Sequence, residues 1–211
     1  MAFVLKLRNR LFEFYASSSG VSAIEFAFAF PLMFMILAGS LELSRSFDHR
    51  RKVTTFARTV ADLVSQGDAI SPIPSTKVND LLSSSKLVLR PYDASKAKVV
   101  VSAIGISVLN ANFQPTVCSS YSTSNASPRS VGQASGIDVP LGFQLQGMRF
   151  IVVEVSMPYA PLFSSDLLSY LGLSARNLSF TEVTYWPVRG GKTYKTNTYN
   201  EVVLPSGNAC P

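Results

Sequence analysis

The 211-residue chain has few of the residues that most metal centres and many enzymes use. It contains a single histidine, His49, and two cysteines, which excludes multi-histidine metal sites and argues against a Cys/His zinc cluster. No Walker-type loop or Gly-x-Gly-x-x-Gly fingerprint follows a predicted strand, and the glycine pair Gly190-Gly191 lies among turn residues. We therefore expect no enzyme activity, no cofactor and no metal site.

Charge is also scarce, since 15% of the residues are charged against about 25% in ordinary soluble domains. The net charge of +6 is not concentrated in one region. No long basic tract and no basic stretch interleaved with aromatic residues marks a nucleic-acid groove. We expect no nucleic-acid partner and interpret the excess of basic residues as an ordinary solvated surface.

The longest apolar run covers residues 21–41 and reads VSAIEFAFAFPLMFMILAGSL, with Glu25 as its one charged residue. A helix of this length spans about 31 Å at roughly 1.5 Å per residue, which matches the hydrocarbon core of a bilayer. Polar residues lie only near the ends of the run, whereas a buried core helix normally shows a polar stripe. The run predicts a membrane-spanning helix, in which Pro31 favours a kink.

The same helix is expected to continue as an amphipathic stem over residues 42–66, which contain no proline or glycine. Apolar residues recur there at the spacing of one helical face: Val53, Phe56, Ala57, Val60, Ala61 and Val64. Gly67 is a suitable C-cap. We predict one helix from about Val21 to Gln66 and interpret His49 as a solvated residue of the stem.

Residues 67–211 predict an α+β head with a small antiparallel sheet and short helices. The expected helices are Ser75–Ser84 and Pro161–Leu171. The expected strands are Lys98–Leu109, Met148–Ser156 and Leu178–Val188, with an edge strand in the tail around Tyr194, Tyr199 and Val202–Leu204. The polar stretch Asn110–Gly147 is expected to be a long loop that contains at most a short hairpin.

A distinctive motif stands at the start of the apolar run. A basic leader, residues 1–20, ends in Gly20, and Glu25 is the fifth residue after it. An ordinary secretory signal is cut after its apolar run, but here the candidate cut precedes the run. The stretch GVSAIEFAFAFPLMFMILAGSLELSR resembles the TadE/TadG-like family of Tad pilus assembly proteins, with a type IV pilin-like N-terminus.

That resemblance implies a function and a set of site residues. Gly20 would precede the cut made by an inner-membrane prepilin peptidase, Val21 would become the new N-terminus, and Glu25 would match the pilin-type glutamate. The implied role is a minor pilin-like assembly subunit of a Tad-type pilus, acting in pilus biogenesis and surface adhesion. Its partners would be other pilin-like subunits, the inner-membrane assembly machinery and the membrane itself.

Physical chemistry independently singles out Glu25. A charged side chain within a bilayer costs about 2.5–3.5 kcal/mol on insertion scales. An ammonium group at Val21, in the same chain or in a neighbour, would neutralise that charge; alternatively, Glu25 reaches the membrane interface. Four small residues in the run predict close approach of another helix: Ala27, Ala29, Ala38 and Gly39.

The orientation of the helix is where the signals conflict. Five basic residues follow the run (Arg45, Arg50, Arg51, Lys52 and Arg58) and three precede it (Lys6, Arg8 and Arg10), so the positive-inside rule places the C-terminal side in the cytoplasm. The family resemblance and the cysteines favour a bacterial inner-membrane protein with its head in the periplasm. An even cysteine count on an exported head predicts a disulfide between Cys118 and Cys210; two buried thiols are the alternative.

A second function is compatible with the same residues. The chain would then be a single-pass, membrane-anchored extracytoplasmic module that senses or holds a ligand. Its natural binding site would be the expected loop Asn110–Gly147, since loops often carry binding residues.

Overall fold

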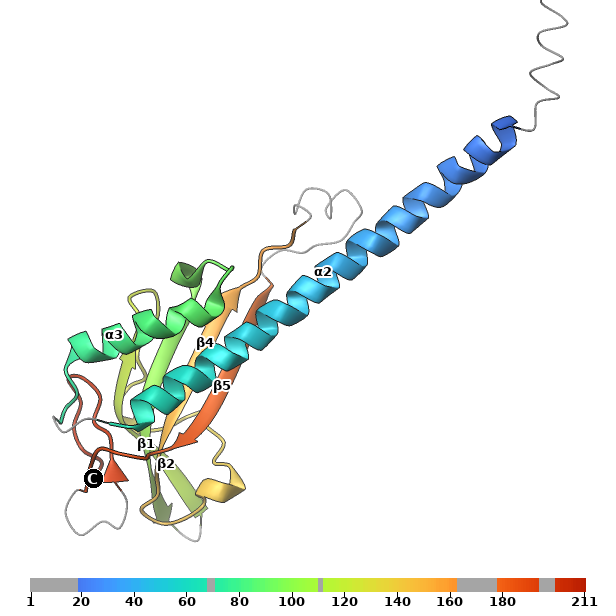
Figure 1. Ribbon diagram of the computed structural model, residues 1–211. Coiled ribbons are helices and arrows are strands. Elements are labelled where there is room, and N and C mark those ends of the chain that lie inside the picture. Colours follow the sequence, from blue (N-terminus) through green and yellow to red (C-terminus); the bar gives the residue numbers. More distant parts are fainter. Residues whose placement is uncertain (1–18, 68–70, 110–111, 163–177, 194–199) are drawn as a thin grey trace, which may run out of the picture. The chain divides into compact units, whose positions relative to one another are not determined.

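The computed structural model describes residues 19–67, 71–109, 112–162, 178–193 and 200–211 (Figure 1). The chain divides into two compact units, Met1–Arg45 and Ser46–Pro211. Helix α2, Ser19–Ser65, supplies the described part of the first unit and continues into the second. The predicted helix from Val21 to Gln66 is therefore confirmed, with both ends within two residues of the expected positions.

The second unit contains a five-stranded antiparallel sheet in the order β3-β2-β1-β4-β5. Its strands are β1 (Lys98–Leu109), β2 (Asn112–Ser122), β3 (Gly132–Gln133), β4 (Arg149–Pro158) and β5 (Ser179–Pro187). A separate pair consists of β6 (Lys192–Thr193) and β7 (Asn200–Glu201). The helices are α3 (Ser75–Ser85), η1 (Lys86–Leu89), η2 (Ala94–Lys96) and η3 (Leu141–Phe143). The α+β class is confirmed.

The sheet has a core on each face, because successive side chains of a strand point to opposite faces. Helices α2 and α3 cover one face, as Figure 1 shows. Its core includes Val101 of β1, Val153 of β4 and Phe56 of α2. A smaller cluster on the other face lies under the chain segment that contains η3, and Phe150 and Ile104 are its centre. Strands β1 and β4 are thus buried on both faces over much of their length.

The apolar stripe of the stem packs on the sheet as predicted, since its six residues are at most 1% exposed. The interpretation of His49 as a solvated residue was wrong, because its side chain is 1% exposed. His49 precedes Val53 by four residues and therefore lies on the same face of the helix. The buried stripe begins one turn earlier than its apolar residues indicate.

The expectation of a loop over Asn110–Gly147 was wrong for β2, which pairs with β1 from Val100↔Ser122 to Leu109↔Asn112. The sequence of this strand, NFQPTVCSSYS, is mostly polar and includes Pro115. Such a strand is possible beside a sheet edge, where a proline removes no ladder hydrogen bond from a neighbour. Only the two-residue strand β3 pairs with its outer side.

The tail was also predicted incorrectly, because β7 ends at Glu201 and pairs with β6 rather than with an edge of the main sheet. Val202, Val203 and Leu204 are buried without forming a strand. Tyr194, Tyr199 and residues 163–171 of the expected helix Pro161–Leu171 lie outside the described residues.

The end of α2 is fastened to the segment that follows β5. The Ser65 carbonyl accepts hydrogen bonds from the backbone N–H groups of Arg189 (2.8 Å) and Gly190 (3.0 Å). A Cβ atom on Gly190 would lie 1.7 Å from the Gln66 carbonyl oxygen, so this close approach requires glycine. Arg189 also forms an ion pair with Asp62, with an N–O distance of 2.8 Å. These contacts satisfy a carbonyl that a helix end leaves unpaired.

Candidate functional site in the apolar segment of α2

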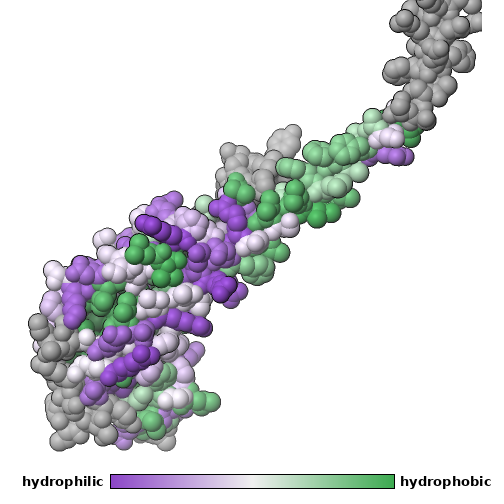
Figure 2. Space-filling model, viewed as in Figure 1, coloured by the Kyte–Doolittle hydropathy of each residue, from purple (hydrophilic) through white to green (hydrophobic). Residues whose placement is uncertain are grey.

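The first half of α2 has a largely apolar surface, which Figure 2 shows in green along the helix, with hydrophilic atoms near its start. Every large apolar side chain from Val21 to Leu41 is between 48% and 80% exposed. Exposed apolar patches on soluble monomers rarely exceed a few hundred Å². This helix is long and apolar enough to cross a membrane, and the most apolar window is not buried by the rest of the chain.

Helix α2 continues through Pro31 without a break in its assignment. Proline has no backbone N–H, so the carbonyl of Ala27 has no donor four residues ahead. Within a bilayer such a carbonyl needs a substitute partner from a neighbouring helix or side chain. Pro31 therefore marks a place where a second helix would satisfy a backbone group.

The four small residues predicted to pack against another helix do not share one face. With about 100° between successive residues, Ala29 and Gly39 each lie about 40° from Glu25 around the helix axis, whereas Ala27 and Ala38 lie about 140–160° away. Ala29 and Gly39 thus lie on the side of Glu25, but they share it with the larger Leu32 and Ile36, each about 20° from Glu25.

A row of phenylalanine rings occupies a different side of the helix, and the sequence analysis did not identify it. The ring centroids of Phe26 and Phe30 are 5.6 Å apart, and those of Phe30 and Phe34 are 6.1 Å apart. The i, i+4 spacing of these residues was the available signal. Phe30 and Phe34 lie about 140–180° from Glu25 around the helix axis, so this row of rings is on the side of the helix away from the acidic residue.

The predicted cleavage position lies at the beginning of α2. Gly20 is the second residue of the helix and is exposed, and a Cβ atom placed on it would have no heavy atom within 4 Å. Val21, the next residue, is 55% exposed. The first turn of a helix has unpaired N–H groups and frays readily, so the Gly20–Val21 peptide bond lies at the most easily opened part of α2.

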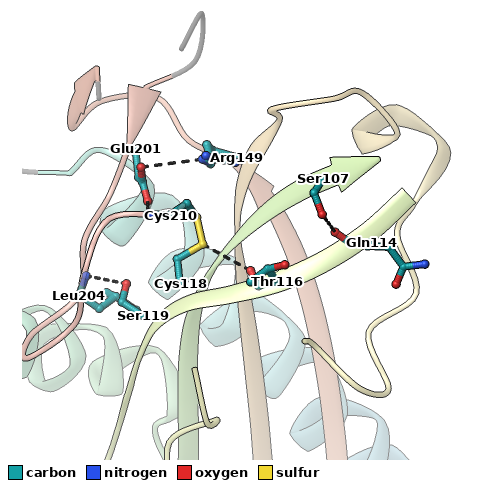
Figure 3. The surroundings of a disulfide bond; sticks show 9 residues. All are labelled: Ser107, Gln114, Thr116, Cys118, Ser119, Arg149, Glu201, Leu204 and Cys210. Carbon is teal, nitrogen blue, oxygen red and sulfur yellow. Dashed lines mark hydrogen bonds and ion pairs between the residues drawn. A yellow bond between two sulfur atoms is a disulfide. The ribbon is translucent and has the colours of Figure 1, made fainter. Parts of the chain in front are cut away.

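The two cysteines form a disulfide in the second unit, with their Cα atoms 4.8 Å apart (Figure 3). Cys118 is placed by a bulge in β2: Ala103 pairs with Ser119 and Ile104 with Val117, which leaves Cys118 as the extra residue. The sequence predicted the pairing but placed Cys118 in the expected loop Asn110–Gly147, whereas it lies in a buried part of a strand.

Polar contacts next to the disulfide hold the C-terminal segment against β2 and β4 (Figure 3). The backbone N–H of Leu204 donates to Ser119 Oγ at 3.0 Å, and that of Cys210 donates to the Glu201 carboxylate. The same carboxylate lies 3.8 Å from Arg149 Nε, and both side chains are buried. Cys118, Cys210 and Glu201 also have the proximity of a metal-ligand group, but the disulfide uses both sulfur atoms.

Gly105 makes room for this arrangement. A Cβ atom on Gly105 would lie 2.6 Å from both Arg149 Nη1 and Cys210 Sγ. Any side chain at this position of β1 would displace the guanidinium group or the disulfide. Glycine is thus required by the close approach of these two groups and not by an unusual backbone angle.

A bidentate ion pair between Arg129 and Glu154 holds the chain segment after β2 on the face of the sheet that no α-helix covers. Arg129 donates from Nε and Nη2 to the two carboxylate oxygens of Glu154, at 2.6 and 2.8 Å. These hydrogen bonds raise the pKa of the Arg129 guanidinium. Arg129 Nη1 also donates to the Ser135 carbonyl at 2.9 Å. Part of the segment predicted to be a binding loop is therefore fixed to β4.

His49 lies in an aromatic cluster at the beginning of the second unit. Its ring centroid is 4.5 Å from that of Tyr92, 5.3 Å from that of Tyr159 and 5.4 Å from that of Phe180. Burial lowers the pKa of the imidazole, and the nearby negative charge of Asp48 opposes that effect. The cluster connects α2 with the ends of β4 and β5.

Comparison with known proteins identifies the segment that carries the candidate site. Residues 20–62 match the family model described as TadE-like protein, which includes Gly20, Glu25 and Pro31. No curated protein and no solved structure matches the chain. The matching family is a structural pilus family that is not known for enzyme activity. Residues 20–62 are therefore similar to the TadE-like family, and the match does not extend over the second unit beyond residue 62.

Proposed function

We propose that this protein is a minor pilin-like subunit that takes part in Tad pilus assembly and in surface adhesion. The observation that carries the proposal is the fully exposed apolar segment of α2, which begins directly after Gly20 and has Glu25 one turn from its start. An apolar helix of this length is stable in a lipid bilayer or within a bundle of similar helices. A pilin-like subunit uses both environments in succession.

The head is proposed to lie in the periplasm, with α2 crossing the inner membrane. The disulfide between Cys118 and Cys210 supports this orientation, because disulfides persist in the periplasm and are rare in the reducing cytoplasm. The basic residues that follow the apolar segment favour the opposite orientation by the positive-inside rule. We give the disulfide more weight, because it is part of the packed core of the second unit.

Processing is proposed to occur at the Gly20–Val21 bond. Hydrolysis would consume one water molecule, release the leader with a carboxylate at Gly20 and leave an ammonium group on Val21. The exposed position of this bond in the first turn of α2 makes it accessible once that turn opens. Val21 and Glu25 are then four residues apart, on neighbouring turns of the same helix.

The glutamate is proposed to pair with the Val21 ammonium group of an adjacent subunit. Pairing would offset the cost of a carboxylate inside the membrane, about 2.5–3.5 kcal/mol on insertion scales. A partner helix on the Glu25 side would pack on Leu32 and Ile36, with the small residues Ala29 and Gly39 beside them. The phenylalanine row is on a different side and would face lipid or a wider groove.

The N-terminus of the membrane-extracted protein tests this proposal. We expect mass spectrometry to find Val21 as the first residue, and Gly20→Phe to block processing and leave the leader attached. Glu25→Gln should be processed normally but be lost from sheared surface filaments. An uncut wild-type chain that is also absent from filaments would exclude the pilin-like role.

A second candidate function is a membrane-anchored binding module. It is favoured by a hollow of about 440 Å³ on the helix-free face of the sheet. The residues around this hollow are Lys98, Val100, Asn125, Ala126, Ser127, Glu154, Val155, Ser156 and Thr181. The Glu154 carboxylate is already paired with Arg129, which leaves Lys98 as the charged group available to a ligand. An uncut protein with a surface-exposed head and no place in filaments would support this function instead.

A further inference from the structure

One end of the second unit carries exposed apolar side chains from several separate segments. They are Phe47 of α2 (62% exposed), Leu87 of η1 (61%), Leu162 after β4 (53%) and Leu178 before β5 (50%). Isolated exposed leucines are ordinary on a protein surface. Four large apolar residues from four segments at one end of a domain indicate an interaction surface.

The contacts around His49 show that these residues belong to the same end. The His49 ring touches Tyr92 and Tyr159, and the Tyr159 N–H donates to the Leu178 carbonyl at 2.7 Å. On the other side, Tyr92 follows η1, and its hydroxyl donates to Asp48 of α2 at 3.0 Å. Phe47 is next to Asp48 in the chain, and Leu178 makes one of these contacts itself. The turn between η1 and Tyr92 includes Leu87, because the Arg90 N–H donates to the Leu87 carbonyl at 3.3 Å.

Basic residues accompany the apolar ones. Arg50 and Arg51 are exposed on α2, Arg90 is exposed directly after η1, and Lys86 begins η1. Acidic groups that the structure describes at this end include Asp48, which accepts a hydrogen bond from Tyr92, and Asp93, which accepts from Ser95. We call this set the proximal surface: Phe47, Arg50, Arg51, Lys86, Leu87, Arg90, Leu162 and Leu178.

We propose that the proximal surface docks on the headgroup layer of the membrane that α2 crosses. Its apolar side chains would enter the interfacial region, and its basic side chains would bind the phosphates of anionic phospholipids. The second unit begins at Ser46, five residues after Leu41, which is about 8 Å along a helix. Chain connectivity therefore keeps the first residues of the unit, Phe47 among them, within reach of the membrane surface.

The composition of the proximal surface fits that environment better than it fits water. Exposed leucine and phenylalanine beside arginine and lysine are the pattern of interfacial protein segments, and basic residues near an anionic leaflet are attracted to it electrostatically. The long basic side chains can keep their charges at the phosphates while their stems cover apolar surface. The proposal depends on membrane anchoring by α2 and not on a pilus role, so it applies to both candidate functions.

Tryptophan scanning with brominated lipids tests the proposal. Trp186 is the sole tryptophan, so a Trp186→Phe background allows one new tryptophan at a time, as Leu87→Trp, Leu178→Trp or Leu141→Trp. Leu141 is 87% exposed in η3, at the other end of the sheet (Figure 1), and is the matched control. The full chain is reconstituted in vesicles of phosphatidylcholine and phosphatidylglycerol with bromine on the acyl chains near the headgroups.

We expect emission from Leu87→Trp and Leu178→Trp to be quenched several-fold more than emission from Leu141→Trp. Equal quenching at all three positions would overturn the proposal, whether the proximal surface is then bare or covered by a second copy of the chain. Each variant is first shown to unfold at the temperature of its background. Because these leucines are exposed, their replacement leaves the core unchanged.

A charge variant tests the role of the anionic lipid. Arg50→Gln combined with Arg90→Gln should lower the quenching in phosphatidylglycerol-containing vesicles to the level found in phosphatidylcholine alone. Arg58→Gln combined with Lys77→Gln removes the same charge from exposed positions outside the proximal surface, and should leave the quenching unchanged. Quenching that is independent of phosphatidylglycerol would refute the headgroup contacts of the basic residues.

Discussion

The two halves of α2 have the same backbone structure, but their apolar side chains differ in exposure. From Val21 to Leu41 the large apolar side chains are exposed around the whole helix, whereas from Val53 to Val64 they form one buried stripe. Both halves are continuous helix, so helix formation does not distinguish them. The difference is the distribution of apolar residues around the axis: it leaves the first half exposed and apolar enough to cross a membrane, and it packs the second half on a sheet.

Removal of the disulfide should give the largest difference in stability between the two units. Cys118→Ser combined with Cys210→Ser opens a link between residues 92 positions apart, and the loop-entropy model assigns such a link about 4–5 kcal/mol. We expect the free energy of unfolding of the second unit to fall by up to this amount in detergent, as measured by denaturant titration. Both cysteines lie in that unit, so the helical circular dichroism of the apolar segment should be retained.

A matched pair of phenylalanine substitutions should give the next largest contrast. Phe56→Ala removes a ring that is 0% exposed in the core and should lower the free energy of unfolding by about 3–5 kcal/mol. Phe30→Ala removes a ring that is 52% exposed and should leave the same transition unchanged. A comparable loss from both substitutions would mean that the apolar segment is part of the folded core.

Much of this contrast was predictable from the sequence. The stripe from Val53 to Val64 was recognised because helical periodicity and burial coincide there, and the apolar run because it has one charge in its length. His49 was missed because a histidine is polar on every scale, although its position on the stripe could have identified it. The phenylalanine row was missed for a different reason: in an entirely apolar helix, no periodicity distinguishes one face from another.

Strand β2 shows where sequence patterns fail for a physical reason. Its residues are only partly buried outside Val117, Cys118 and Ser119, so no hydrophobic alternation is needed for it to pair with β1. The contact between the disulfide, Arg149 and Gly105 is equally invisible in the sequence, because it depends on a bulge that shifts the register of β2 by one residue. Long-range register is set by the partner strand.

Two glycine substitutions, one in each unit, should differ by a smaller amount in their effect on stability. Gly105→Ala forces a Cβ atom against Arg149 and the disulfide and should destabilise the second unit by about 1–3 kcal/mol. Gly39→Ala lies in the apolar segment, where a Cβ atom meets nothing within 4 Å, and should not lower the stability of that unit. Thermal unfolding of the two variants checks both expectations; a Gly105→Ala protein as stable as the wild type would mean that the surrounding groups move aside.

The smallest expected effect is a pH dependence that originates in the second half of α2. Because burial lowers the pKa of His49 below its ordinary 6.5, the unfolded chain binds the proton more readily than the folded one. Stability should be full above pH 6.5 and fall as the pH decreases from there to the lowered pKa. His49→Phe should remove this part of the pH dependence in denaturant titrations. An identical pH profile in the variant would show that His49 is not responsible.

The most direct test of the whole account is the location of the head. An epitope is attached after Pro211, and protease is added to intact spheroplasts and, separately, to lysed cells. The account predicts that the epitope is lost in intact spheroplasts while a cytoplasmic marker protein survives. An epitope that is protected in spheroplasts and degraded only after lysis would contradict the account, because the head would then lie on the cytoplasmic side.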